Sequence, residues 1–382
     1  MICYMVFKFT KFLPCGFLFA GIALAEVQGP HPQLRRAVPS DAQGAEDSVA
    51  LSAISGPVLG FVFDEVRHGL RPIWGVPGAC SLGDLTPLEL DTLYFSPRQE
   101  YALGIASANK EVVLVLLESA PGIVSGRVLT EVEADPQRIE ISSEGRSTAI
   151  LNSDRGRVQI MTGLPRVPKL GRQVDISLIP RRIRAMTVSD NGDWVLLAAS
   201  EGSSEVVFAL GPEGGPKTVA QVQGVSAMSF VESAGSLDAA IADSGTNEVF
   251  LLRDISGTST RIPLLNAQDG LDQPAAIRVL ENRQLLVANS GAKTIIVLDL
   301  ETAMTRVCQL DQVPTGLNNL RSSAVFRFTD LESPALWLFD AAGQEPRTVF
   351  VANTTGRQRL EPQLTQDPNY SRWSRIRNER QR

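Results

Sequence analysis

The sequence predicts an all-β fold, a seven-bladed β-propeller, because short apolar runs bounded by turn residues recur in the same order at a constant period. The residue that ends the first run of each copy is Phe95, Ile141, Val188, Val231 and Val279. The serine that follows the second run is Ser107, Ser153, Ser200, Ser244 and Ser290. Both markers repeat at roughly the 40–50 residues that one propeller blade requires.

Each copy contains three short runs, as residues 276–300 (AIRVLENRQLLVANSGAKTIIVLDL) show most clearly. The runs are too short for helices, are rich in Val, Ile and Leu, and are separated by Ser, Asn, Asp and Gly. These features are typical of β-strands joined by tight turns. Several runs are apolar at nearly every position, as expected for strands that are covered on both faces by neighbouring blades.

The repeat resembles the YVTN and WD40-like propeller repeats, in which a strand, an S-P-D-G turn, a second strand, an asparagine and a V-x-V-I-D strand follow one another. The best matches are Ser189-Asp190-Asn191-Gly192, Asn289 and Val297-Leu298-Asp299, and Phe95-Ser96-Pro97 keeps only the S-P pair. The resemblance covers about residues 48–353. It implies a secreted propeller of the surface-layer or lactonase type, a group that includes scaffolds, binding proteins and a few enzymes.

Residues 1–25 have the pattern of a secretory signal peptide. Lys8 and Lys11 precede an apolar stretch at 12–24, and the A-x-A motif Ala23-Leu24-Ala25 stands before Glu26. We therefore expect cleavage after Ala25, a secreted or periplasmic location, and no membrane span in the mature chain. The alternative is an uncleaved anchor, for which the apolar stretch is short.

The signal is followed by three further regions. Residues 26–47 form a polar linker rich in Pro, Gly and Ala, for which we expect no packed structure. Residues 48–353 form the propeller. Residues 354–382 form a basic tail, which we expect to be disordered. The arginines of this tail could instead contact an anionic surface such as lipid or polysaccharide.

The blades follow one another from the linker to the tail. Residues 48–84 predict a partial blade: 48–55 as a second strand, 58–64 (VLGFVFD) as a third and 70–78 (LRPIWGVPG) as a fourth, with the innermost strand missing. Full blades are predicted at about 90–133, 137–178, 183–223, 225–266, 274–311 and 316–353. The alternative is six blades with an N-terminal decoration. Either ring must close to protect its strand edges, and we expect closure between the first and last blades to be the weak point.

The composition restricts the function. The 382 residues carry a net charge of −6 and no clustered basic surface in the propeller, which argues against nucleic acid as a partner. Only His31 and His68 are present, which leaves little scope for histidine-based metal or triad chemistry. There is no G-x-S-x-G, P-loop, G-x-G-x-x-G after a strand, or C-x-x-C. The sequence therefore predicts no catalytic residue and no cofactor.

Two cysteines, Cys80 and Cys308, remain after removal of the signal. An even pair in a secreted chain permits a disulfide. Cys80 follows the first blade and Cys308 lies in the outer strand of the sixth, so one blade should separate them. That separation exceeds the reach of a disulfide, and we expect two free thiols.

Two sets of polar residues are candidates for function. Asn152, Asp243 and Asn289 each precede the marker serine; they could form a polar rim that binds a partner, or they could simply shape turns. Asp91, Asp135 and Asp272 are the acids nearest to the loops that lead into the inner strands. They could contribute to a metal site, although each is a typical turn-capping residue.

The predicted function is a secreted or periplasmic, non-enzymatic propeller that binds a protein or polysaccharide on one face, with a monomer as the expected state. The alternative is a hydrolase or lyase of the lactonase type, with an oxygen-ligand, Ca²⁺-type site in the central channel. A third possibility is a cell-surface protein that is held by its arginine-rich tail.

Overall fold

A computed structural model describes residues 56–117, 124–180, 182–233, 236–281, 283–331, 335–343 and 345–352. The chain divides into two units, Met1–Ala53 and Ile54–Arg382, and the described residues all belong to the second. The expected signal peptide (1–25), linker (26–47) and basic tail (354–382) lie outside the described residues, and so does the strand expected at 48–55.

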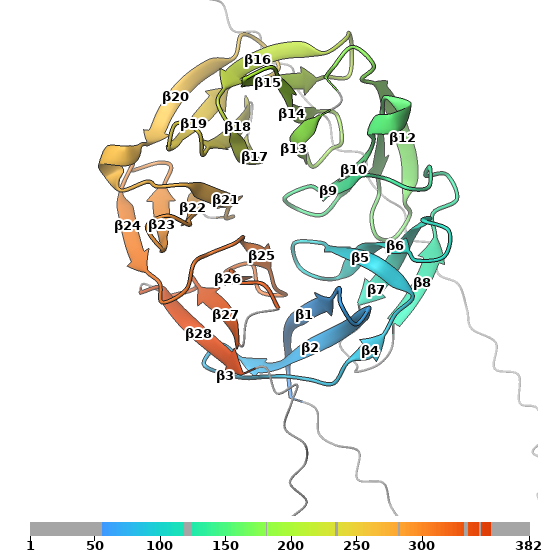
Figure 1. The fold of residues 1–382 in the computed structure, drawn as a ribbon, viewed down its shortest axis with the longest axis vertical. Helices are drawn as coiled ribbons and strands as arrows, with labels where there is room; N and C mark the ends of the chain where they lie inside the picture. The colour runs from blue at the N-terminus through green and yellow to red at the C-terminus, as the bar shows by residue number, and fades with distance from the viewer. Residues whose placement is uncertain are drawn as a thin grey trace, which may run out of the picture. The chain divides into compact units, whose positions relative to one another are not determined.

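Seven antiparallel sheets stand radially around a central channel, which confirms the seven-bladed propeller over the six-bladed alternative (Figure 1). Blade 1 holds β1 (Val58–Asp64), β2 (Gly69–Val76), β3 (Ala79–Leu82) and β4 (Thr86–Pro87). Blade 2 holds β5 (Leu90–Phe95), β6 (Tyr101–Ala106), β7 (Val112–Leu117) and β8 (Val124–Val128). Blade 3 holds β9 (Arg138–Ile141), β10 (Ser147–Asn152), β11 (Arg157–Thr162) and β12 (Lys169–Asp175), with a short 3-10 turn at Ser153–Arg155.

The remaining four blades follow in chain order. Blade 4 holds β13 (Ile183–Val188), β14 (Val195–Glu201), β15 (Ser204–Leu210) and β16 (Lys217–Val222). Blade 5 holds β17 (Val225–Ser233), β18 (Ser236–Asp243), β19 (Glu248–Arg253) and β20 (Thr260–Leu265). Blade 6 holds β21 (Pro274–Val279), β22 (Gln284–Asn289), β23 (Thr294–Asp299) and β24 (Thr305–Gln309), after a 3-10 turn at Ala267–Asp269. Blade 7 holds β25 (Asn318–Asn319), β26 (Val325–Arg327), β27 (Ala335–Asp340) and β28 (Arg347–Ala352).

The serines of the predicted turns have a defined structural role. The hydroxyl oxygen of Ser189 accepts a hydrogen bond from the backbone N–H of Trp194 (3.0 Å), and its carbonyl accepts one from Gly192, which has a φ of 76°. Ser96 and Ser142 close the corresponding turns of blades 2 and 3 in the same way. A short hydroxyl next to the backbone suits this tight reversal, which explains the recurrence of serine at this place.

Apolar clusters between consecutive blades form the core. The cluster between blades 4 and 5, for example, joins Leu196 of β14 and Val207 of β15 to Ile241 of β18 and Phe250 of β19, all fully buried. Burial on both faces explains why the middle strands are continuously apolar rather than alternating. Among the described residues, no helix is long and apolar enough to span a membrane.

Blade 1 differs from its prediction. β1, expected as a third strand, lies at the inner end of its sheet and borders the channel, and β2, expected as a fourth, lies next to it. β1 begins beside the inner turn of blade 7, where Arg321 N–H donates to Leu59 O (3.1 Å), and the turn after it reaches the start of β5. It therefore runs opposite to the other inner strands, as a second strand does. The sequence misassigned it because apolar runs of equal length do not reveal their direction.

Among the described residues, no strand pairs with the inner edge of β1, and a side chain caps this edge. Gln99 is 1% exposed, and its amide accepts a hydrogen bond from Phe61 N–H (2.6 Å) and donates one to Phe61 O (3.1 Å). The same amide donates to Asn319 O of blade 7 (2.8 Å). One glutamine from blade 2 thus imitates the peptide group of a neighbouring strand and ties blades 1, 2 and 7 together.

Candidate functional site

A cavity of about 380 Å³ occupies the central channel, and the inner strands of all seven blades line it. Its wall combines apolar groups such as Phe61 and Phe95 with hydroxyls and amides from Ser142, Thr187 and Asn318. Small-molecule sites in proteins commonly have volumes of roughly 300–1,000 Å³, so the cavity has the size for a small ligand.

Charged side chains from opposite blades face each other in the channel. Glu140 lies on β9 of blade 3, and Arg278 lies on β21 of blade 6. Burial raises the pKa of Glu140, although Arg278 and Arg138 oppose this shift, and burial lowers the pKa of Arg278, which Glu140 opposes. Arg138 also contacts Glu140, with 3.5 Å between Nη1 and Oε1. The two charges therefore influence each other across the channel.

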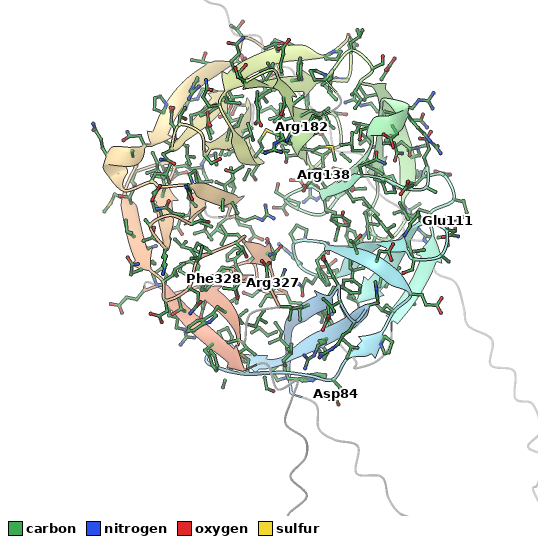
Figure 2. All side chains as sticks on the ribbon, in the orientation of Figure 1. Asp84, Glu111, Arg138, Arg182, Arg327 and Phe328 are labelled. Atoms are coloured by element: carbon green, nitrogen blue, oxygen red, sulfur yellow. The ribbon has the colours of Figure 1, made fainter. Side chains whose placement is uncertain are left out.

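A second group of charges lies in the channel toward blade 7. Burial lowers the pKa of Arg327 on β26, and Asp330 and Glu65 oppose the shift. Figure 2 shows Arg138, Arg182 and Arg327 at the inner rim of the ring, around the channel. Burial also raises the pKa of Tyr94, whose ring lines the same cavity. The channel is thus lined by fixed charges of both signs.

An ion pair spans the mouth of the channel on the face that carries the turns between first and second strands, which we call the turn face. Arg98 of blade 2 donates to Glu281 of blade 6 (2.7 Å), and both side chains are 56% exposed. A cavity of about 270 Å³ lies at this pair and shares Pro97, Val279 and Asn319 with the channel cavity. The channel therefore opens to the turn face past an exposed and weak ion pair.

A larger groove of about 600 Å³ crosses the turn face over blades 2, 3 and 4. Its charged side chains are Arg98, Glu100, Glu144, Arg146, Arg166 and Asp190. Hydrogen bonds between blades hold the groove. The Asp190 carboxylate accepts one from the backbone N–H of Glu144 (2.7 Å) and one from the hydroxyl of Ser143 (3.1 Å). The groove therefore presents mixed charges on turns whose backbone is fixed.

The three residues predicted as a polar rim lie on the opposite face, at the ends of second strands. Asn152, Asp243 and Asn289 are at most 2% exposed. The Asn289 amide bonds Asp272 N–H, Gly270 O and the Thr294 hydroxyl, and the Asp243 carboxylate accepts from the backbone of 223, 224 and 245. Each holds a loop that leads into its blade. A partner on this face would contact those loops rather than the three side chains, and their role in binding stays a prediction.

The other candidate residues are dispersed. Asp91, Asp135 and Asp272 belong to blades 2, 3 and 6, and Asp91 forms an ion pair with Lys110. In the described part of the chain, no group of three His, Cys, Asp or Glu side chains is placed to hold a metal ion. Cys80 on β3 and Cys308 on β24 lie in blades 1 and 6, with blade 7 between them, and form no disulfide with each other.

Sequence reasoning missed Glu140, Arg278, Arg327 and the pair Arg98–Glu281. A signal for the first two was present: Glu140 and Arg278 each stand one place before the marker residues Ile141 and Val279, in a run where an apolar residue flanks them on either side. A charge in such a run indicates a position that faces a channel rather than a neighbouring blade.

Comparison with known proteins supports the fold alone. No known protein family matches the sequence, and no curated protein sequence matches it significantly. A functionally unknown protein from Desulfotomaculum acetoxidans is similar in structure (TM-score 0.53, 14% identity, covering 78% of this chain and 96% of that one). A putative 6-phosphogluconolactonase from Bacteroides fragilis is similar to the same degree (TM-score 0.52, 12% identity, covering 79% and 97%). Likeness at these identities establishes a β-propeller and leaves the activity open.

Proposed function

We propose that the protein is a secreted, non-enzymatic β-propeller that binds a protein partner on its turn face. The observation that carries the proposal is the groove of about 600 Å³ over blades 2–4, which is lined by three basic and three acidic side chains. Fixed charges of both signs give a protein interface its register and its choice of partner. A polysaccharide would favour exposed aromatic platforms in the groove, and the one aromatic group among the large exposed apolar side chains of the described residues, Phe350 on β28, is not part of the groove lining.

The groove also has an exposed apolar contact beside its charges. Val167 is 61% exposed and follows Arg166 in the loop between the third and fourth strands of blade 3. Interfaces combine such apolar contacts with a charged rim. Loops that vary on a rigid frame are the usual place for binding residues, and the turns of blades 2–4 are anchored by Gln99, Ser142 and Asp190.

A photo-crosslinking residue at Val167, introduced in the cell that makes the protein, tests the proposal. We expect a discrete crosslinked product from Val167 that disappears when Arg146→Glu and Arg166→Glu are added. A crosslinker at Val307, which is 59% exposed on β24 at the side of blade 6, is the matched control. The substitutions Arg127→Glu and Lys293→Glu, which have the same charge change outside the groove, should leave the Val167 product intact. Equal products at Val167 and Val307 would contradict the proposal.

Secretion has its own test. The proposed cleavage after Ala25 predicts that N-terminal sequencing of the protein recovered from the periplasm or medium begins at Glu26. Protein that starts at Met1 or Met5 and stays with the membrane fraction would instead indicate an uncleaved anchor.

A further inference from the structure

Arg278 lines the channel and forms few contacts with other polar groups. Its one hydrogen bond among the described residues joins Nη1 to the carbonyl of its own neighbour Ile277 (3.2 Å). It belongs to none of the ion pairs within 4.0 Å in the described part of the chain. A guanidinium carries five N–H donors, and Arg278 lines the cavity, so most of its donors have no protein partner among the described residues. An incoming anion could accept hydrogen bonds from these donors.

Glu140 provides the complementary half of the site. It lies opposite Arg278 and close enough to oppose the shift of the arginine's pKa, yet the two side chains are not in contact. Space therefore remains between a cation and an acceptor. A dianion at Arg278 would be repelled by Glu140, whereas a monoanion that also carries a hydrogen-bond donor could satisfy both groups.

We propose that the channel binds a small monocarboxylate bearing hydroxyl or ammonium groups, with its carboxylate on Arg278 and a donor on Glu140. Ser142, Ser229 and Thr187 line the same cavity and supply neutral hydrogen-bonding groups. The volume of about 380 Å³ accommodates one small molecule and excludes a folded partner. The mouth at Arg98 and Glu281 gives the ligand its way in from the turn face. This site is separate from the groove over blades 2–4 and does not depend on a protein partner.

Titration calorimetry with D-glucuronate, D-glucose, L-serine and inorganic phosphate tests the site in the full chain. D-Glucuronate and D-glucose differ in the carboxylate, so binding of the first and not of the second is expected. Arg278→Gln should weaken D-glucuronate about tenfold or more, which is about 1.4 kcal/mol or more, while Arg278→Lys retains part of the affinity. Arg127→Gln on the outer strand β8 is the control and should change nothing.

The Glu140→Gln variant tests the acceptor half of the site separately from the Arg278 half. It also keeps the proposal testable if the Arg278 variant does not fold. It should weaken the neutral-overall L-serine, whose ammonium group pairs with the carboxylate, and strengthen inorganic phosphate, because the repulsion is removed. Circular dichroism melting of each variant checks that the propeller is folded. The proposal would be overturned if D-glucuronate gave no more binding heat than D-glucose up to millimolar concentrations. Equal binding of D-glucuronate to the wild type and to a folded Arg278→Gln variant would overturn it as well. Neither result bears on the crosslink at Val167.

Discussion

Gln99 shows how a single side chain can join three blades of the ring. It has a left-handed backbone (φ 48°), is almost fully buried, and completes the exposed edge of β1 through Phe61. Its bond to Asn319 O brings blade 7 into the same contact. Nothing in the sequence around residue 99 reveals this role, because the two partner residues, Phe61 and Asn319, are distant in the chain. Contacts of this kind can be recognised only in the three-dimensional structure.

Replacement of Gln99 should therefore be costly. Gln99→Ala leaves the amide and carbonyl of Phe61 and the carbonyl of Asn319 without their partner, and we expect a loss of about 1–3 kcal/mol in the free energy of unfolding, measured by urea denaturation. Arg98→Ala, one residue away, breaks only an exposed ion pair and should cost about 1 kcal/mol or less. A Gln99→Ala variant as stable as Arg98→Ala would contradict this account of the edge.

Glu140 predicts a specific pH dependence. Burial raises its pKa in the folded protein, so the folded state holds the proton more tightly than the unfolded chain does. Stability is therefore greatest below the ordinary carboxyl pKa of about 4 and is lost as the pH rises through the raised value. Relative to Glu140→Gln, the wild type should be more stable at pH 4 than at pH 7 in urea titrations. A stability difference that stays constant or grows with pH would show that the channel does not disfavour the carboxylate.

At the scale of the strands and turns, the sequence predicted much of the structure correctly. The marker residues Phe95, Ile141, Val188 and Val279 each end an inner strand, and a turn follows that begins with serine in the first three and with Leu280 in the last. Val231 does not, since β17 continues to Ser233. The spacing of apolar residues and the choice of turn residues depend on neighbours in the chain, so the sequence could predict them. The direction of β1 and the pairing of charges across the channel depend on residues far apart in the chain, so the sequence could not predict them.

The buried amides at the ends of second strands make a prediction about elements. Asn289 satisfies two backbone groups of the loop before β21, at Asp272 and Gly270, and also bonds Thr294 at 2.9 Å. Asn289→Ala should lower the free energy of unfolding by about 1–3 kcal/mol in urea titrations. Asn152→Ala should cost less, because the side-chain oxygen of Asn152 has no hydrogen-bond partner among the described residues. If Asn152→Ala and Asn289→Ala together left stability unchanged and abolished binding of a partner, the rim hypothesis would be supported instead.

On the scale of the whole molecule, side-chain contacts and a backbone hydrogen bond from Arg321 to Leu59 join blades 7 and 1 and close the ring. Val62 and Ile73 of blade 1 pack against Val325 and Leu338 of blade 7, and Arg347 of β28 donates to Pro77 O (3.2 Å). The sequence predicted that this junction would be weak. The smallest apolar cluster of the seven lies instead on the other side of blade 1, between blades 1 and 2, and the sheet of blade 1 is three strands wide, with β3 and β4 both pairing with β2. The weakness of the junction between blades 1 and 7 stays a prediction.

The candidate sites follow from this architecture, but the sequence features that predict the architecture do not predict the sites. A ring of seven blades brings Glu140 and Arg278, which are far apart in sequence, to opposite walls of one channel, and Arg98 and Glu281 to one mouth. The sequence could show that charges interrupt apolar runs, but only the number and order of the blades determine which charges meet. The same order of blades places the turns of blades 2–4 side by side, where they line one groove.

Hydrogen–deuterium exchange, followed by mass spectrometry under native conditions, tests the central claim that the propeller is a ring joined through blade 1. Local opening follows the least buried and least hydrogen-bonded parts of a fold. Peptides from β1 to β4 should exchange first, those from β28 next, and those from blades 4 and 5, which share the largest apolar cluster, last. Protection that is uniform around the ring, or lost first in blades 4 and 5, would contradict the account.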